Sequence, residues 1–248
     1  MEGKFAEDHA DGVTSPDYEV PYAFEGSITA TPYDEALVVL GFQLVEDLRG
    51  KIVVELASGA GSFIRGLLNA DIRAYGIDPF YSMGLYNMQK RFALSEDLLR
   101  GKMDPEYRDV AIASLHTHYA MLLDSLSLYY DNYKVGTFSE IPLSDDVADY
   151  TVCIFGLEII EGLTEIRGWE EEYYYTAFEE MLRVTKTGGQ IIFAPCYSFE
   201  IEEETLLLRA LKQLIQEKKI SFVLEPVNIV THTGVPVESR LRITKLSE

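Results

Sequence analysis

The sequence predicts an α/β fold, doubly wound around a mostly parallel sheet, and two observations carry this prediction. First, two short apolar runs rich in β-branched residues, 51–56 and 72–77, flank a helical stretch. A strand, a helix and a strand in such quick succession form a βαβ unit, whose strands are parallel and whose crossover is right-handed. Second, strands and helices alternate again after residue 147, which extends the same sheet.

The predicted elements begin with a helix over 32–48, which has Thr31 as its N-cap, Pro32 at the first helical position and Gly50 at its end. The βαβ unit follows, with its helix ending at Asn69. Further along the chain we expect a strand at 147–155, a helix at 170–184, a strand at 189–194, a helix at 202–218, and strands at 220–230 and 235–246. The last two strands are consecutive, so we expect them to pair antiparallel.

The chain departs from this alternation after the second strand. Apolar residues there recur at spacings of three and four, which marks one face of a helix; they are Ile112, Leu115, Tyr119, Leu122, Leu126 and Tyr129. Another helix is expected before it, over 83–100, ending at Gly101. We therefore predict a helical cap inserted at about 80–133, where a lid can sit.

Length and composition limit the protein's class. With 248 residues, 47% of them hydrophobic, one domain at 31–248 is expected, after an N-terminal arm at 1–30 that is polar and partly disordered. The start of the arm is acidic, whereas a signal peptide would be basic and then apolar. No apolar run approaches the roughly 18 residues of a membrane span. We therefore expect a cytoplasmic protein. Cys153 and Cys196 lie in apolar stretches, which favours reduced core thiols over a disulfide or a metal site.

The charge is strongly negative and unevenly placed. The formal net charge is −20, which argues against nucleic acid as a partner because phosphate binding requires Lys and Arg. Residues 1–35 hold nine acidic and one basic residue, and residues 140–180 hold twelve and one. These two segments carry nearly all of the excess, and they favour a neutral or cationic small-molecule partner. A solvated acidic rim that aids solubility is the alternative.

A short turn after the first strand carries the chemical signal. Small residues at 57–61 let the backbone turn sharply and let a ligand approach, while the following helix directs free N–H groups at it. Asp78 closes the next strand and can accept both hydroxyl hydrogens of a ribose. A dinucleotide-binding fingerprint would place a small residue at Ile64, so a nicotinamide cofactor is the weaker interpretation.

The same residues resemble a known family. The stretch 53–61, with an apolar run, an acid at Glu55 and a loop of small residues, is similar to the first motif of class I S-adenosylmethionine (SAM)-dependent methyltransferases. The segment 75–78 resembles the second motif, 136–152 the third strand, loop and fourth strand, and 179–193 the helix, Gly-Gly turn and fifth strand. The motifs stand in family order, and the resemblance implies a Rossmann-like seven-stranded sheet with an antiparallel last strand.

The resemblance also implies roles for single residues. Glu55 would lie near the amino-acid part of SAM, and Asp78 would hold its ribose hydroxyls. Ala57 replaces the family's first glycine, a departure that is tolerated if this residue need not adopt a positive φ. Where relatives carry an acid for the adenine, this chain has Thr137, so the contact would fall to a backbone group, to Ser139 or to the ring of Phe138. The cofactor-binding positions implied are Glu55, Ala57, Gly59, Gly61, Asp78, Pro79, Phe80, Thr137 and Phe138.

Methyl transfer from a sulfonium requires alignment and exclusion of water, and a general base only when the acceptor must lose a proton. The candidate bases are Glu158, which follows the fourth strand where the family places acceptor-facing residues, and His116 and His118 in the cap. Each has a plain alternative, as a loop acid or a boundary histidine. We expect a methyltransferase acting on an O, N or C atom of a small molecule. A non-catalytic SAM-binding or regulatory protein and an NAD(P)-dependent oxidoreductase are the alternatives.

Overall fold

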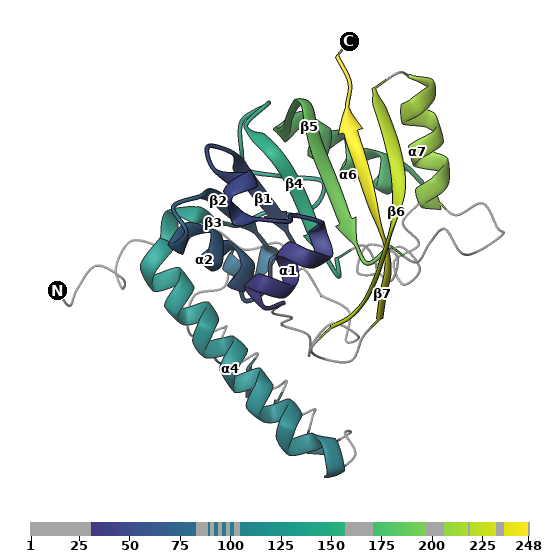
Figure 1. Cartoon of the computed structure of the whole chain (residues 1–248). Coiled ribbons are helices and arrows are strands. Elements are labelled where there is room, and N and C mark those ends of the chain that lie inside the picture. Colours follow the sequence, from purple (N-terminus) through teal and green to yellow (C-terminus); the bar gives the residue numbers. More distant parts are fainter. Residues whose placement is uncertain are drawn as a thin grey trace, which may run out of the picture.

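The computed structural model describes residues 31–82, 89, 92–93, 96–97, 100–101, 105–156, 171–196, 206–217, 219–231 and 236–247. The expectations for the arm at 1–30 and for Glu158 therefore lie outside the described residues. Within them, helices lie on both faces of one twisted sheet (Figure 1).

The sheet has seven strands in the order β3-β2-β1-β4-β5-β7-β6. They are β1 Ile52–Leu56, β2 Arg73–Ile77, β3 Tyr133–Lys134, β4 Ala148–Ile154, β5 Thr185–Ala194, β6 Ile220–Val230 and β7 Pro236–Lys245. Only β7 runs antiparallel to its neighbours, since it is inserted between β5 and β6, which both point the other way. The first five strands follow the doubly wound order, so the topological switch point lies between β1 and β4. The predicted fold class is confirmed.

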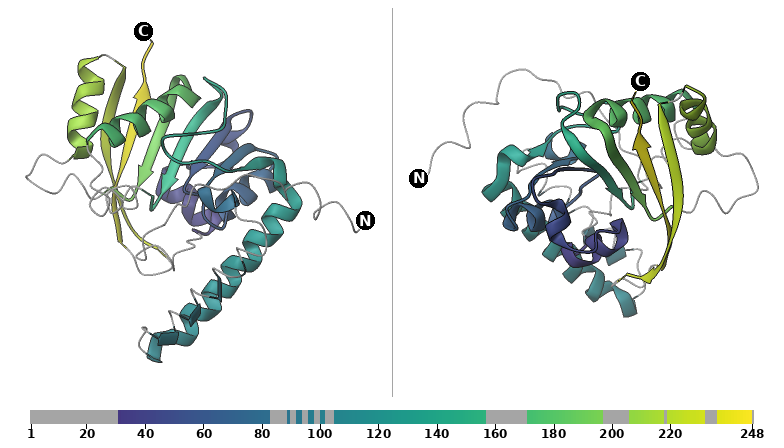
Figure 2. Two further views of the ribbon diagram at one scale, coloured as in Figure 1. Left: turned by 180° about the vertical axis from the view of Figure 1, so that it is seen from behind. Right: turned by 45° about the horizontal axis from the view of Figure 1, so that its top comes forward.

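Two apolar layers hold the helices on the sheet. The helices with described bounds are α1 Tyr33–Leu40, α2 Ser62–Asn69, α4 Pro105–Tyr129, α6 Glu171–Val184 and α7 Leu206–Gln216, with short 3-10 turns η2 Val45–Leu48, η3 Pro79–Ser82 and η4 Tyr130–Asn132. Helices α6 and α7 lie on one face of the sheet, and α1 and α2 lie on the other (Figure 2). Their buried side chains pack against the sheet. Burial of these apolar faces is the main stabilising contribution.

The first helix is shorter than predicted. It ends at Leu40 because Gly41 adopts a left-handed φ of 80° and its N–H bonds back to the carbonyls of Leu37 and Val38. Residues 45–48 form a separate 3-10 turn before Gly50. Pro32, not Thr31, occupies the N-cap position and forms no side-chain cap. The predicted single helix over 32–48 is therefore wrong.

The insertion after β2 contains the long helix α4. Its carboxyl-terminal end lies beside α2 and leads into β3, whereas its amino-terminal end extends away from the sheet (Figure 1). Burial of Ile112, Leu115 and Leu122 confirms the predicted apolar stripe. No helix in the described ranges is long and apolar enough to cross a membrane.

Candidate functional site

The loop between β1 and α2 is a tight turn at the carboxyl edge of the sheet. Gly59 and Gly61 adopt positive φ angles of 51° and 68°, and the Gly61 N–H donates to the Ser58 carbonyl over 2.7 Å. Gly61 is also the N-cap residue of α2. The turn therefore places the start of α2 next to the ends of β1 and β2, as the sequence predicted.

Ala57 has a backbone conformation that the sequence did not lead us to expect. Its φ is 53°, so the residue that replaces the family's first glycine does adopt the left-handed conformation that an alanine disfavours. Phe155, at the end of β4, has a φ of 56°. Because β1 and β4 are neighbours, two non-glycine residues with strained backbones lie on either side of the switch point. Strain of this kind clusters at functional sites.

Asp78 ties the end of β2 to the turn. Its carboxylate accepts the Gly59 N–H over 3.0 Å, and its own N–H donates to the carbonyl of Lys134 in β3 over 3.1 Å. Leu56 and Ile77 are register partners in parallel strands, which puts the residues that follow them at the same edge. The structure thus brings together Asp78, Gly59 and Gly61, as predicted.

Glu55 is the most unusual group at this edge. Its side chain is buried, and its Oε2 has no hydrogen-bond partner. Burial, and then the nearby Asp78 carboxylate, raise the pKa of Glu55 well above its ordinary value. A buried carboxyl without a partner is costly unless a bound cation or donor satisfies it. The pair of acids therefore suits a ligand that carries positive charge.

Two tyrosines that no sequence motif indicated also bind the turn. Tyr81 lies three residues after Asp78, and its hydroxyl donates to the Gly59 carbonyl over 3.1 Å and also contacts the Ser58 hydroxyl. Tyr133 begins β3, and its hydroxyl donates to the Gly61 carbonyl over 2.9 Å. Strand patterns could place Tyr133 in a strand, but its contact with the turn depends on β2 and β3 pairing.

The loop after β3 holds the positions expected at the adenine. Thr137 forms a bridge with Glu140, and its hydroxyl lies 3.3 Å from that of Ser139. Phe138 is buried in the apolar cluster on the α6 side of the sheet, among Leu56 and Cys153. The adenine contact therefore stays a prediction, with Ser139 half-buried and Phe138 buried.

The other predicted residues are spread more widely. His116 is exposed on α4, where its Nε2 lies 3.1 Å from Glu96 and its ring packs against Phe92. His118 is half-buried on the same helix. Pro79 is exposed in η3, and the side chain of Phe80 lies outside the described part. Cys153 and Cys196 are buried and are not joined in a disulfide. The structure does not bring either histidine to the glycine turn.

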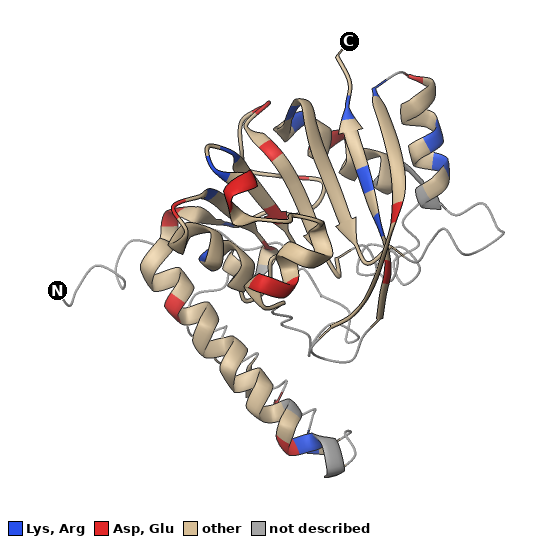
Figure 3. Cartoon of the chain, viewed as in Figure 1, with Lys and Arg blue, Asp and Glu red and all other residues tan. Residues whose placement is uncertain are grey.

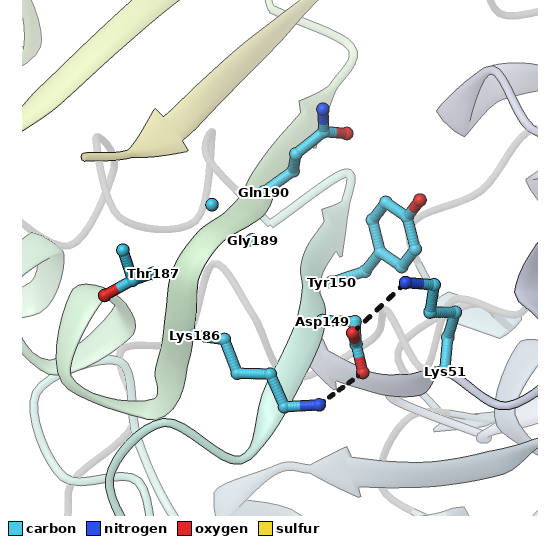
Figure 4. Close-up of a pocket in the computed structure, with 8 residues that line it drawn as sticks. Lys51, Asp149, Tyr150, Lys186, Thr187, Gly189 and Gln190 are labelled. Carbon is cyan, nitrogen blue, oxygen red and sulfur yellow. Dashed lines mark hydrogen bonds and ion pairs between the residues drawn. The ribbon is translucent and has the colours of Figure 1, made fainter. Parts of the chain in front are cut away.

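A pocket of about 230 Å³ lies at the opposite, amino-terminal edge of the sheet (Figure 4). The carboxylate of Asp149 accepts from the Lys186 ammonium over 2.7 Å and from Lys51 over 3.5 Å. The single carboxylate is shared by the two ammonium groups, and it also accepts the Ile52 N–H. The pocket is thus explained as the point where the strand ends are joined. No cluster of three or more potential metal ligands occurs in the described residues.

Comparison with solved structures found distant matches. Solved structures that match include a protein of Pyrococcus horikoshii (16% identity, 90% of this chain and 95% of that one, TM-score 0.46), a SAM-dependent methyltransferase of Methanosarcina mazei (15%, 80% and 93%, 0.42) and one of Aquifex aeolicus (13%, 84% and 90%, 0.39). No family model and no curated protein matches the sequence. The strand order and the reversed β7 are those of the Rossmann-like methyltransferase fold. Similarity at this level assigns no activity, acceptor or partner to this chain.

Proposed function

We propose that this protein is a SAM-dependent methyltransferase. The observation that carries the proposal is the buried Glu55 carboxyl, unpartnered at Oε2 and close to Asp78, at the edge where the glycine turn meets α2. SAM is a cation with a ribose and an ammonium group, so its charge and donors match these two acids. The ordered sequence motifs support the same ligand.

The residues present fit this cofactor in named roles. Asp78 would hold the ribose hydroxyls, Glu55 would lie near the amino-acid part, and Gly59 and Gly61 would line the methionine and ribose side. When bound, SAM supplies an activated methyl group on sulfur. The chain's own task is then to orient the acceptor in line with that group and to keep water out.

Two groups of basic residues lie far from this edge, whereas Arg65 and Lys134 lie close to it. Arg240, Arg242 and Lys245 are on β7, and Arg209 and Lys212 are on α7, at the other side of the sheet from β1 and β2 (Figure 3). The negative field expected from the net charge of −20 favours a neutral or cationic acceptor over an anionic one. We propose a small-molecule acceptor in the cytoplasm, a domain spanning 31–248, and a cap at about 80–133 beside the acceptor entrance. Glu158, His116 and His118 remain the candidate bases.

Calorimetry with SAM and S-adenosylhomocysteine on the full chain tests the proposal. Saturable one-site binding of both is expected. Binding of neither would remove the assignment, and binding of NAD(P) instead would favour the oxidoreductase alternative. If both bind but a broad acceptor panel shows no methyl transfer, the non-catalytic SAM-binding protein is the better description.

A further inference from the structure

The glycine turn is held from outside by two phenols that come from different parts of the chain. Tyr81 follows β2 through η3, and Tyr133 opens β3. Their rings pack edge to face with centroids 5.3 Å apart, so they form one unit over the turn. Neither residue belongs to a motif that the proposed function uses.

The hydroxyl of Tyr81 joins two residues of the turn. It has one hydrogen, which it donates to the Gly59 carbonyl, so it accepts from the Ser58 hydroxyl. Burial, and then the Asp78 carboxylate, raise the pKa of Tyr81 well above its ordinary value, which keeps the phenol a donor at all physiological pH values. The Asp78 carboxylate accepts the Gly59 N–H, so both polar backbone groups of Gly59 are engaged by residues 78–81.

Tyr133 secures the other end of the turn. Its buried hydroxyl donates to the Gly61 carbonyl over 2.9 Å, and burial raises its pKa as well. A side chain at Gly61 would collide with the ring of Tyr133, so the glycine is required by this packing in addition to its left-handed φ of 68°. The carbonyl of Gly61 also accepts the Arg65 N–H in the first turn of α2. Tyr133 therefore fixes the direction in which α2 leaves the turn.

Helix α4 supports the two rings. Ala60 and Leu122 are fully buried against each other, and Tyr81, Tyr119 and Leu126 pack around them. Tyr133 itself follows α4 directly in the chain, through the short turn η4. The insertion is thus connected to the turn through the same two tyrosines.

We infer that Tyr81 and Tyr133 are positioning residues that hold the turn of Ser58, Gly59 and Gly61 in the shape that receives the cofactor. We call these two tyrosines, with their hydrogen bonds to the turn, the clamp. The inference rests on the proposed function for the identity of the ligand, but the clamp itself is a property of the chain without ligand. Each phenol acts through the turn and not by touching the reacting atoms.

The test compares Tyr81→Phe, Tyr133→Phe and the double variant with Tyr175→Phe. Tyr175 is a matched control, because its phenol donates to Glu217 on the other face of the sheet. Amide exchange of residues 57–61 in the ligand-free chain is measured first. Exchange about tenfold faster in both clamp variants, with no change in the control, is expected. Exchange equal to wild type in both clamp variants would overturn the inference.

Affinity for S-adenosylhomocysteine is the second readout. Tyr81→Phe loses two neutral hydrogen bonds and Tyr133→Phe loses one. We expect a dissociation constant raised about threefold to tenfold in each clamp variant and unchanged in Tyr175→Phe. Ser58→Ala should add little to Tyr81→Phe, because both remove the same contact; full additivity would overturn the role of Tyr81. If wild type fails to bind the ligand, the proposed function fails, and amide exchange alone still decides on the clamp. Should Tyr133→Phe fail to fold, the Tyr81 and Ser58 variants carry the test.

Discussion

The carboxylate of Asp78 accepts the backbone N–H of Gly59 over 3.0 Å, joining the end of β2 to the turn after β1. This bond connects the two predicted halves of the ligand site before any ligand is present. It also orients the Asp78 carboxylate, which is buried, at the edge of the sheet. A preorganised acceptor loses less conformational freedom on binding a ribose.

Replacing Asp78 with Ala should weaken SAM binding at least tenfold. Hydrogen bonds to a charged group contribute about 1.5–3 kcal/mol each, and every 1.4 kcal/mol corresponds to about tenfold in affinity. Calorimetry of the variant against wild type measures this. Asp124→Ala, which removes an exposed acid of α4 that pairs with Arg65 of α2, is the control and should bind as wild type does. An unchanged dissociation constant in Asp78→Ala would show that the ribose assignment is wrong.

Because of Glu55, we expect the free energy of unfolding to depend on pH. Its pKa is raised in the folded state by burial and by Asp78, so the folded chain holds a proton that the unfolded chain has released. The contribution of Glu55 is therefore fully present below the ordinary Glu pKa and is lost as pH rises through the raised value. Glu55→Gln should remove this loss, leaving a stability curve flatter than that of wild type above pH 5. Urea unfolding across a pH series measures it, and parallel curves would contradict the prediction.

The same carboxyl links pH to ligand binding. A cation next to Glu55 favours its ionised form, so SAM should bind more tightly as pH rises through the raised pKa of the ligand-free state. Binding should release a proton in wild type and none in Glu55→Gln. Calorimetry in two buffers of different ionisation enthalpy detects that proton, and equal enthalpies in both buffers would rule the linkage out.

The sequence alone predicts features that depend on neighbouring residues. It does not predict features that depend on contacts between distant segments of the chain. The glycines of the turn, the strand run before it and Asp78 are all readable because each needs only its neighbours. The end of α1 was missed because Gly41 lies in an apolar stretch, and its glycine is required by Arg240 on β7, whose guanidinium would collide with a side chain there. Arg240 binds the carbonyls of Val38 and Val39 at that helix end. The roles of Tyr81 and Tyr133 were not predicted either, because their hydrogen bonds join them to residues of the turn that are distant in the sequence.

Arg183 binds the loop that follows β3 and should contribute to stability through these contacts. From the last turn of α6 its guanidinium donates to Glu180 over 2.6 Å, to Asp145 over 2.7 Å and to the carbonyls of Ile141 and Leu143 over 2.9 Å. Arg183→Met should lower the free energy of unfolding by about 2 kcal/mol, and Arg183→Lys by less, because lysine keeps the charge without the fork. Urea unfolding gives the free energies. A loss below about 0.5 kcal/mol in Arg183→Met would place this arginine among ordinary surface ion pairs.

Replacing Ala57 with glycine should make the chain more stable, whereas the replacement of Arg183 should make it less stable. Its φ of 53° costs an L-residue about 1–2 kcal/mol that a glycine does not pay, although glycine loses more entropy on folding. Ala57→Gly should therefore raise the free energy of unfolding by up to about 1 kcal/mol. Ala60→Gly is the matched control, because Ala60 packs against Leu122 and its replacement should destabilise the chain. If Ala57→Gly is also destabilising, the methyl group of Ala57 contributes more by packing than its backbone costs in strain. If it stabilises the chain yet weakens binding of S-adenosylhomocysteine, the strained alanine serves the ligand site.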